Sequence, residues 1–429
     1  MMSHLRKIKK TRKKSLEFYI LSLFLITSSL FPCTNSKTAS FRDKRVRLGN
    51  EIFLEAFPNE LQHKYLGLVI NQTSVLPGGK PLVNALVDKG INIQAIFSPE
   101  HGFKGAVEGG KQIKDSFFKN IKIFSLYGKT KKPNPDQMRD VDALIYDIQD
   151  VGTRFYTYIT TLKFILEAAA DAQIPVYVLD RPNPCGGIII EGPLLQPGYE
   201  SFIGAVQIPI RYGLTLGELA AMMKGEGWVS EEVDLHVVKM ANWKREYFWE
   251  DTDLSWIPTS PNIPSAETAM SYPGTGLLGG IILNQGLGTP HPFLQFGAPW
   301  LKPELIVQSL NNGEDFGIKL EILKYMPCSI PGKTLHPAYE NKTCQGIFIH
   351  IIHPEKFFSV RFTLAVIKAL KDYFPDKIYS GKSDLDLLFG NNLLSQYLRG
   401  QISYDRLLSE IEKEEIIFRE TSRKYLLYE

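Results

Sequence analysis

The chain has 429 residues, of which 44% are hydrophobic and 22% are charged, and its formal net charge is +3. This composition is typical of a globular protein, and the length favours two domains over one. Much of the positive excess lies in the first fourteen residues, so the rest of the chain has no basic surface that would indicate a nucleic-acid-binding protein.

The N-terminus has the order of an export signal. Basic residues are followed by an apolar run at 18–32, which is shorter than the ~20 residues of a membrane-spanning helix. Cys33 follows at once, as in a bacterial lipoprotein signal, although Phe31 and Pro32 stand where small residues are usual. We expect a signal peptide at 1–33, lipidation at Cys33, a linker at 34–48 and a place in the cell envelope, periplasmic or outer-membrane-associated. An uncleaved anchor and ordinary cleavage beyond Cys33 are the alternatives.

Strand and helix patterns alternate in the next two hundred residues. Strands are expected at 65–70, 92–97, 121–126, 143–146, 175–179 and 233–240, and helices at 51–61, 82–89, 158–172 and 216–224. Thr215 and Glu218 have the spacing of a capping box at the start of the last helix. The alternation predicts an α/β fold, a Rossmann-like, doubly wound parallel sheet at residues 49–300.

The ends of these strands carry polar residues: Asn71, Glu100, Asp147 with Asp150, and Asp180. The carboxyl ends of parallel strands lie along one edge of a sheet, and ligands of such folds bind there. We therefore expect the four groups to converge. The Pro- and Gly-rich segment 243–300 is expected to cover this edge, because loops of such length tend to be functional.

After residue 300 the pattern starts again. Helices at 303–311, 359–373 and 403–421 and strands at 318–325 and 346–352 predict a second, smaller α+β domain at 301–429. The four cysteines form no disulfide framework, and Cys328 and Cys344 are expected as separate thiols, with a pair as the alternative. His350 and His353 lie in an apolar strand pattern, so they are interpreted as structural and no metal site is expected.

Glu100 and His101 follow Pro99 and stand next to Gly102. A glutamate at a strand end beside glycines can be shielded from water, which is the setting in which a general acid keeps its proton. The alternative is a solvated loop glutamate beside a histidine that only packs.

Asp147, Asp150 and Arg154 allow two interpretations. They form an ion-pair network that fixes the loop, or one carboxylate is a base or charge stabiliser and Arg154 binds an anionic substrate. Asp180 with Arg181 also allows a functional and a structural interpretation, since Asp180 could simply cap the turn. Glu191 is a further carboxylate near the same edge, and Tyr156 could stack on a sugar face, although most aromatic residues belong to the core. Carboxylates with Arg, Asn and Tyr, without a phosphate loop, fit glycoside hydrolysis.

Six motifs resemble the bacterial exo-β-N-acetylmuramidase family, long catalogued as a domain of unknown function. They are SPEHGFKG at 98–105, SLYG at 125–128, YDIQDVGTRFYTY at 146–158, LDRPNP at 179–184, SPNIP at 260–264 and FGAPW at 296–300. The motifs are long and occur in the same order, and the resemblance extends from about residue 67 to residue 428.

The resemblance implies a pocket between the two domains, no cofactor, and release of terminal N-acetylmuramic acid from peptidoglycan fragments. It implies Glu100 as the catalytic acid with His101 beside it. Further residues would line the pocket, and the lactyl carboxylate of muramic acid would explain an arginine among them. These residues are Asp147, Asp150, Arg154, Asp180, Arg181 and Asn183.

One segment departs from the family pattern. After the shared YPGT motif at 272–275, family members carry two glutamates and an arginine, where this chain has Gly279, Gln285 and Leu287. His291 also stands where an arginine is common. Gln285 could hydrogen-bond a sugar hydroxyl but cannot act as a base.

Two hypotheses follow from this departure. The chain is an envelope exo-muramidase, or it is a non-catalytic muropeptide-binding lipoprotein that has lost part of the active site. A nucleotide-dependent enzyme is disfavoured, because no G-x-G-x-x-G motif follows the first strand.

Overall fold

The computed structural model describes residues 45–378 and 384–429. The predicted signal peptide, Cys33 and most of the predicted linker lie outside these residues. Within the described ranges, no helix has both the length and the apolar character needed to cross a membrane.

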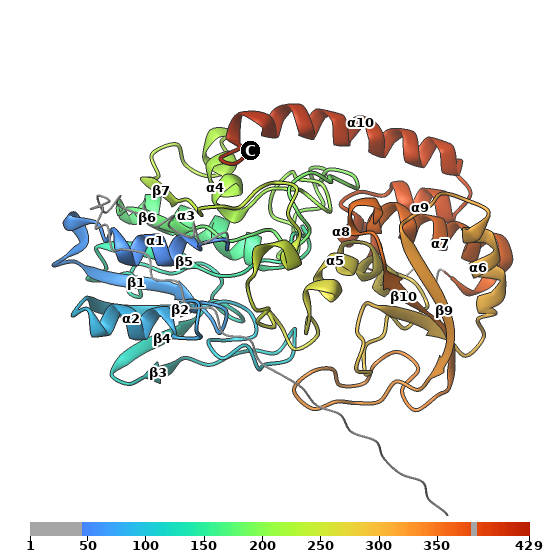
Figure 1. The fold of residues 1–429 in the computed structure, drawn as a ribbon, viewed down its shortest axis with the longest axis horizontal. Coiled ribbons are helices and arrows are strands. Elements are labelled where there is room, and N and C mark those ends of the chain that lie inside the picture. The colour runs from blue at the N-terminus through green and yellow to red at the C-terminus, as the bar shows by residue number, and fades with distance from the viewer. Residues whose placement is uncertain (1–44, 379–383) are drawn as a thin grey trace, which may run out of the picture. The chain divides into compact units, whose positions relative to one another are not determined.

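A seven-stranded sheet forms the first part of the fold (Figure 1), in the order β3-β4-β2-β1-β5-β6-β7. All neighbours pair in parallel except β3 with β4. The strands are β1 (Tyr65–Ile70), β2 (Asn92–Ser98), β3 (Ser116–Phe118), β4 (Ile121–Ser125), β5 (Ala143–Asp147), β6 (Val176–Leu179) and β7 (Leu235–Val238). The short β3 was not expected from the sequence.

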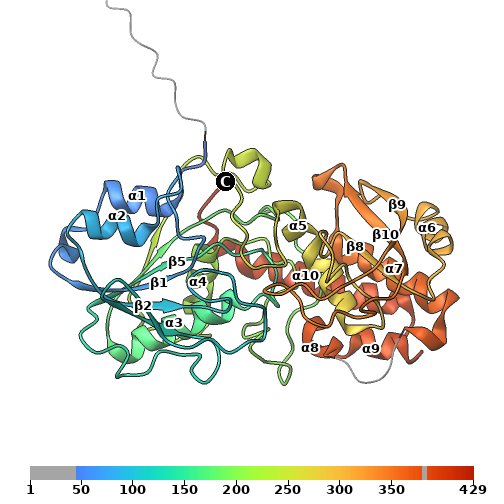
Figure 2. The ribbon, with the colours of Figure 1, turned by 90° about the horizontal axis from the view of Figure 1, so that it is seen from below.

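Helices cover both faces of this sheet. α1 (Gly49–Glu55) and α2 (Leu82–Asp88) share one apolar core with it, whereas α3 (Tyr158–Ala172) and α4 (Leu216–Gly225) share another on the opposite face (Figure 2). Both faces of the central strands are therefore buried, which explains why β1 and β5 are nearly uninterrupted apolar runs. The capping box of α4 is present, with the Thr215 hydroxyl accepting from the Glu218 amide. The predicted α/β fold class is confirmed.

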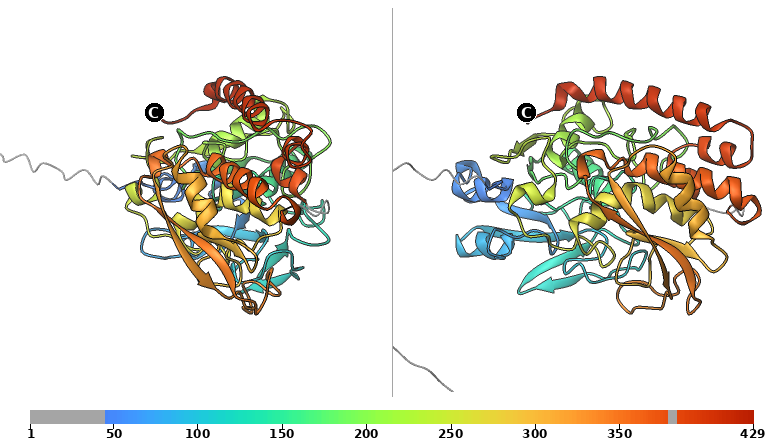
Figure 3. Two further views of the ribbon diagram at one scale, coloured as in Figure 1. Left: turned by 90° about the vertical axis from the view of Figure 1, so that its right-hand side faces the viewer. Right: turned by 45° about the vertical axis from the view of Figure 1, so that its right-hand side comes forward.

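A smaller part contains the antiparallel sheet β8-β10-β9 and its helices (Figure 3). Its elements are α5 (Ala266–Thr275), β8 (Gln295–Ala298), α6 (Pro303–Asn311), β9 (Ile318–Tyr325), β10 (Cys344–Ile351), α7 (Ser359–Tyr373), α8 (Leu385–Phe389), α9 (Leu393–Leu398) and α10 (Tyr404–Ser422). The sequence placed residues up to 300 with the first domain, whereas α5 packs on α7 and β8 pairs with β10. α5 contains Pro273 and Gly274, and β8 has four residues, so neither gives a periodic signal.

The last helix returns the chain to the first sheet. α10 extends from α9 back toward α4 (Figures 1 and 3). The carboxylates of Glu414 and Glu415 accept from the amides of Leu194 and Gly192, both at 2.8 Å. The Tyr428 hydroxyl then donates to Asp180 at 2.6 Å. The C-terminus therefore closes on the end of β6.

Candidate functional site

The polar residues predicted to converge do lie along one edge of the first sheet. Asn71 follows β1, Glu100 follows β2, Asp147 ends β5 and Asp180 follows β6, and these strands are parallel neighbours. All four residues are buried. Their hydrogen bonds differ, however, and these separate the groups that hold the fold from those that face a possible ligand.

Glu100 is held by two donors from different parts of the chain. The amide of Gly110 donates to Oε1 at 2.9 Å, and the hydroxyl of Thr157 donates to Oε2 at 2.8 Å. Burial and the nearby Glu100 carboxylate raise the pKa of Tyr127 to about 12. Glu100 itself keeps 8% exposure. Its carboxyl group is therefore oriented by the protein and still reaches the surface.

His101 is fixed beside Glu100 by a strained backbone. Its φ is 68°, in the left-handed region that a residue with a side chain rarely adopts. Nδ1 lies 2.7 Å from the carbonyl of Val107. In the neutral ring Nδ1 must therefore carry the proton, which leaves Nε2 as an acceptor. A Cβ at Gly109 would contact both side chains, 3.5 Å from Cε1 of His101 and 3.7 Å from Oε1 of Glu100.

Tyrosines stand behind Glu100. Tyr158 accepts from the Asn71 amide at 3.0 Å and donates to the carbonyl of Thr259 at 2.8 Å. The Tyr156 ring packs edge-on against Tyr158 and Tyr272, so it is a buried wall residue. Burial raises the pKa of Tyr272, followed by the electrostatic effects of Tyr156, Glu100 and Asp150. Tyr272 thus lies within electrostatic reach of both carboxyl groups.

Asp150 is buried and incompletely paired. Oδ2 accepts from the Gly152 amide at 2.7 Å and from the Tyr212 hydroxyl, whereas Oδ1 has no partner in the described part of the chain. Burial raises the pKa of this carboxyl to about 6, against the opposing effect of hydrogen bonding by Tyr212 and by the backbone of Gly152 and Val151. Asp150 can therefore exchange a proton near neutral pH.

Asp147 and Arg181 form a buried ion pair. Nε of Arg181 donates to Oδ1 of Asp147 at 2.6 Å, and the Asn50 amide donates to Oδ2 at 3.1 Å. Both carboxylate oxygens are thus occupied by protein groups. Arg181 also lines a pocket described below.

Three further predicted residues have hydrogen bonds that hold the fold together. Asp180 accepts from the amides of Arg181 and Gly217 and from the hydroxyls of Thr215 and Tyr428. Asn183 bridges the Leu214 carbonyl and the Cys185 amide within its loop. Glu191 pairs with Arg211 at 3.3 Å and accepts from the amides of Val360 and Arg361 in the first turn of α7. A role for these residues in binding stays a prediction.

Arg154 lies in the interior, at 1% exposure. Its guanidinium donates to the carbonyls of Pro193 at 2.6 Å, Ile208 at 2.8 Å and Leu388 at 3.0 Å. Burial lowers its pKa to about 9. These bonds tie the first sheet's loops to α8, and they account for both terminal nitrogens.

The departing segment places two of its altered residues side by side. A Cβ built on Gly279 would lie 2.8 Å from Nε2 of Gln285. Leu287 packs on the apolar core that also contacts Tyr272. The two positions at which family members carry glutamate therefore face each other.

Sequence reasoning missed the two groups that orient Glu100, namely the amide of Gly110 and the hydroxyl of Thr157. Thr157 is the N-cap residue of α3, but its side chain makes no capping hydrogen bond, and its hydroxyl donates to Glu100 instead. A threonine before a helix is usually read as a cap. Only the pairing of β2 and β5 through β1 brings it to Glu100.

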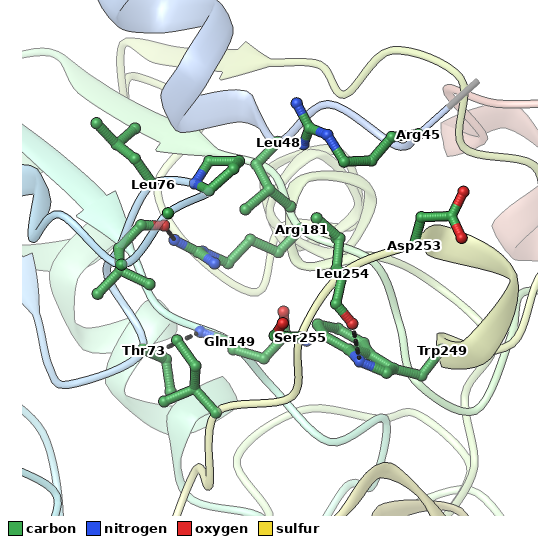
Figure 4. A pocket seen from close by; sticks show the side chains of 15 residues that line it. Arg45, Leu48, Thr73, Leu76, Gln149, Arg181, Trp249, Asp253, Leu254 and Ser255 are labelled. Atoms are coloured by element: carbon green, nitrogen blue, oxygen red, sulfur yellow. Dashed lines mark hydrogen bonds between the residues drawn. The ribbon is translucent and has the colours of Figure 1, made fainter. Parts of the chain in front are cut away.

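A separate pocket of about 390 Å³ opens at the ends of β1, β5 and β6 (Figure 4). Thr73, Gln149 and Arg181 line it from the sheet, and Trp249, Leu254 and Ser255 line it from the covering segment. We call it the switch-point pocket, because β1 and β5 are the strands between which the chain order of the sheet reverses. Neither Glu100 nor His101 lines it.

No cluster of His, Cys, Asp and Glu able to hold a metal ion occurs in residues 45–378 and 384–429. Cys328 and Cys344 are free thiols, as expected. His350 contacts Glu321 at 2.8 Å on neighbouring strands.

Comparisons with known proteins cover nearly the whole described chain. The family model "Exo-beta-N-acetylmuramidase NamZ, N-terminal" matches residues 66–267, and its C-terminal counterpart matches residues 270–428. Peptidoglycan beta-N-acetylmuramidase NamZ of Bacillus subtilis is 35% identical over 412 residues, which are 95% of this chain and 97% of that protein. Crystal structures of two DUF1343 family proteins from Bacteroides fragilis are also similar. One has a TM-score of 0.82 at 34% identity and the other 0.72 at 30% identity, and each match covers 90% of this chain and 99% of the other.

Proposed function

The chain belongs to the exo-β-N-acetylmuramidase family and is a glycosidase, and from this premise we propose that Glu100 is its catalytic acid and that it releases terminal N-acetylmuramic acid from peptidoglycan fragments. The observation that carries the residue assignment is the geometry of the Glu100 carboxyl group. It is oriented by Gly110 and Thr157, from two distant segments, yet it keeps contact with the surface.

The proposed chemistry is protonation of the leaving glycosidic oxygen by Glu100, as positive charge develops on the sugar ring. The His101 ring lies near Glu100, since a Cβ on Gly109 would contact both side chains, and its Nε2 is the acceptor that can take a proton from the attacking water. Asp150 is the second carboxyl group of the proposal, because its Oδ1 has no hydrogen-bond partner among the described residues and burial raises its pKa to about 6.

The experiment compares turnover of a chromogenic N-acetylmuramide by the wild-type protein, Glu100→Gln and Glu304→Gln. Glu304 is an exposed first-turn residue of α6, so its variant is a matched control for the loss of one carboxylate. We expect Glu100→Gln to reduce kcat by about 10²- to 10⁴-fold, the usual contribution of a general acid, and the control to keep full activity. Unchanged turnover in Glu100→Gln would remove Glu100 from the mechanism.

The same assay decides the non-catalytic alternative raised by Gly279 and Gln285. Binding of the muramide by the wild-type protein without turnover would support a binding lipoprotein. Turnover that depends on Glu100 shows that the two lost carboxylates are dispensable for cleavage.

We further propose that the protein is exported to the cell envelope and lipidated at Cys33. The support is the order of basic residues, apolar run and cysteine at the N-terminus. Mass spectrometry of the mature protein tests it: a diacylglyceryl-modified N-terminal Cys33 is expected, and an intact Met1 contradicts export.

A further inference from the structure

A long connection, which we call the strap, joins β9 to β10 in the smaller part of the fold. It consists of residues 326–343, between the last residue of β9 and the first residue of β10. At its base the amide of Asn341 donates to the carbonyl of Pro327 at 2.8 Å, so the two ends of the loop lie close together. Connections of this length in compact domains are uncommon, and compact loops with closed ends are frequently functional.

The tip of the strap, residues 330–336, contacts the loop that carries Glu100. The amide of Leu335 donates to Oε1 of Glu108 at 2.6 Å. Two residues further along that loop, the amide of Gly110 donates to the Glu100 carboxyl group at 2.9 Å. The tip is therefore docked within a few residues of the group that orients the proposed catalytic acid.

The tip has a second anchor on the covering segment. Nδ2 of Asn262 donates to the Thr334 hydroxyl at 2.9 Å, and this hydroxyl donates back to Oδ1 of Asn262 at 3.2 Å. Asn262 comes shortly after Thr259, whose carbonyl accepts from the Tyr158 hydroxyl behind Glu100. The strap thus bridges from the Glu100 loop to the covering segment.

Both anchors are weakly shielded from water. Within residues 331–336 only Thr334 is buried, and the Leu335 side chain is 38% exposed. The tip therefore buries little apolar surface against either neighbour. Segments with few buried apolar contacts and exposed hydrogen bonds are the ones that open locally while the rest of the fold stays intact.

The strap also contains strained backbone. His336, Tyr339 and Asn341 have φ values of 52°, 60° and 57°, in the left-handed region that is uncommon for a residue with a side chain. Three such residues within six positions make the docked conformation costly, and strain of this kind clusters at ligand clamps and switch regions. A movement of the tip relative to its base can relieve part of this strain.

The docked arrangement leaves little room at the proposed acid. Glu100 and His101 are each only 8% exposed. A general acid has to come within about 2.6–3.2 Å of the oxygen that it protonates, and the sugar on that oxygen has to fit beside it. A segment near Glu100 therefore has to move when substrate enters, and the tip of the strap is held by few contacts.

We propose that the strap is a gate over Glu100, which releases Glu108 and Asn262 before a saccharide can enter. This inference rests on the proposed catalytic role of Glu100. After entry the tip docks again on the same two anchors and shields the bound sugar from bulk water, as active-site lids do.

The test locks the strap reversibly. Glu108→Cys with Leu335→Cys places two thiols at the docking contact, in a full-length protein in which Cys33 and the exposed Cys328 are replaced by serine. A short bis-maleimide with a central disulfide cross-links the pair, and reduction of that disulfide releases it. We expect no turnover of the chromogenic N-acetylmuramide by the locked protein and full recovery after reduction. Leu335→Cys alone, treated with the same reagent, controls for its bulk and should stay active.

Equal turnover before and after reduction would overturn the gate. Absence of turnover in the wild-type protein would refute the proposed function instead. In that case calorimetric binding of N-acetylmuramic acid replaces turnover as the measurement. Equal binding by the locked and the released protein then overturns the gate, and binding by the released protein alone supports it.

A second variant tests the anchor on the covering segment. Thr334→Val removes the hydroxyl that exchanges two hydrogen bonds with Asn262, and Thr343→Val, at an exposed position of the same strap, is the matched control. We expect amide hydrogen exchange in residues 330–336 to become about tenfold faster in Thr334→Val, because the lost hydrogen bonds raise the population of the open strap. The control should exchange like the wild type, and equal exchange in the two variants would contradict the gate.

Discussion

Replacing Arg154 by methionine separates the two interpretations of this residue. The guanidinium donates to the carbonyls of Pro193, Ile208 and Leu388 and has 1% exposure. Methionine has a similar length and no donors, so the variant leaves three buried carbonyls without their partner. The structure therefore predicts a loss of stability and no loss of substrate affinity.

The size of the effect follows from these three hydrogen bonds. A hydrogen bond from a charged group contributes about 1.5–3 kcal/mol, so three give a gross loss of roughly 5–9 kcal/mol. Removing a buried guanidinium also removes its desolvation penalty, which is several kcal/mol. We expect a net reduction of about 3–5 kcal/mol in the free energy of unfolding, the usual range when one side of a buried charged arrangement is truncated.

Urea unfolding followed by tryptophan fluorescence measures this difference, provided that the slope of free energy against urea is unchanged. Arg154→Lys is the matched variant: it keeps the charge but cannot reach three carbonyls from one ammonium, so an intermediate loss is expected. At a temperature where both variants are folded, KM for the chromogenic muramide should equal that of the wild type. An unchanged urea midpoint together with a tenfold higher KM would show that Arg154 binds the anionic substrate, and would refute this reasoning.

Two further predictions concern Glu100 and Asp150. Thr157→Val removes the hydroxyl that donates to Glu100 at 2.8 Å and should lower kcat about tenfold at unchanged KM, whereas Thr161→Val, one turn further along α3, should not; a change in KM alone would contradict an orienting role. Burial raises the pKa of Asp150 from the usual 3.8 to about 6, so the folded state holds this proton more tightly than the unfolded state, and the carboxyl makes folding less favourable as the pH rises from about 4 through 6. The stability of Asp150→Asn should therefore increase relative to that of the wild type between pH 4.5 and pH 7.5 in urea titrations, and a constant difference would contradict the raised pKa.

Much of the fold was readable from local patterns. The bounds expected for β1, α3, α6, β9 and α7 agree with the structure, because each is a run whose apolar residues follow one period up to a clear break. The elements that escaped prediction lack such a run. α8 and α9 have five and six residues, and α5 contains a proline, so tertiary contacts decide their conformation.

The candidate site was only partly readable, because convergence at the sheet edge does not determine what each side chain does there. Glu100 and Asp180 both follow parallel strands and both are buried. Every partner of Asp180 comes from the protein, including Tyr428 from the end of the chain. No local pattern could reveal that contact, since the two residues meet only after α10 has returned to the sheet.

The distinction between fold-holding and ligand-facing groups therefore lies in what remains unused after folding. The terminal nitrogens of Arg154 and both carboxylate oxygens of Asp147 form hydrogen bonds with other parts of the chain. Oδ1 of Asp150 and Oε1 of Gln149 have no donor in the described residues, although both are buried. Buried polar atoms in folded proteins are nearly always hydrogen-bonded, so such exceptions mark where the fold leaves room for a ligand. These two atoms belong to consecutive residues of the loop after β5, and further buried atoms without a partner occur on Gln72 after β1 and on Thr153 and Arg154 in the same loop. An unpaired atom is therefore only one sign of a ligand-facing group, and Glu100 is distinguished by the exposure that it keeps.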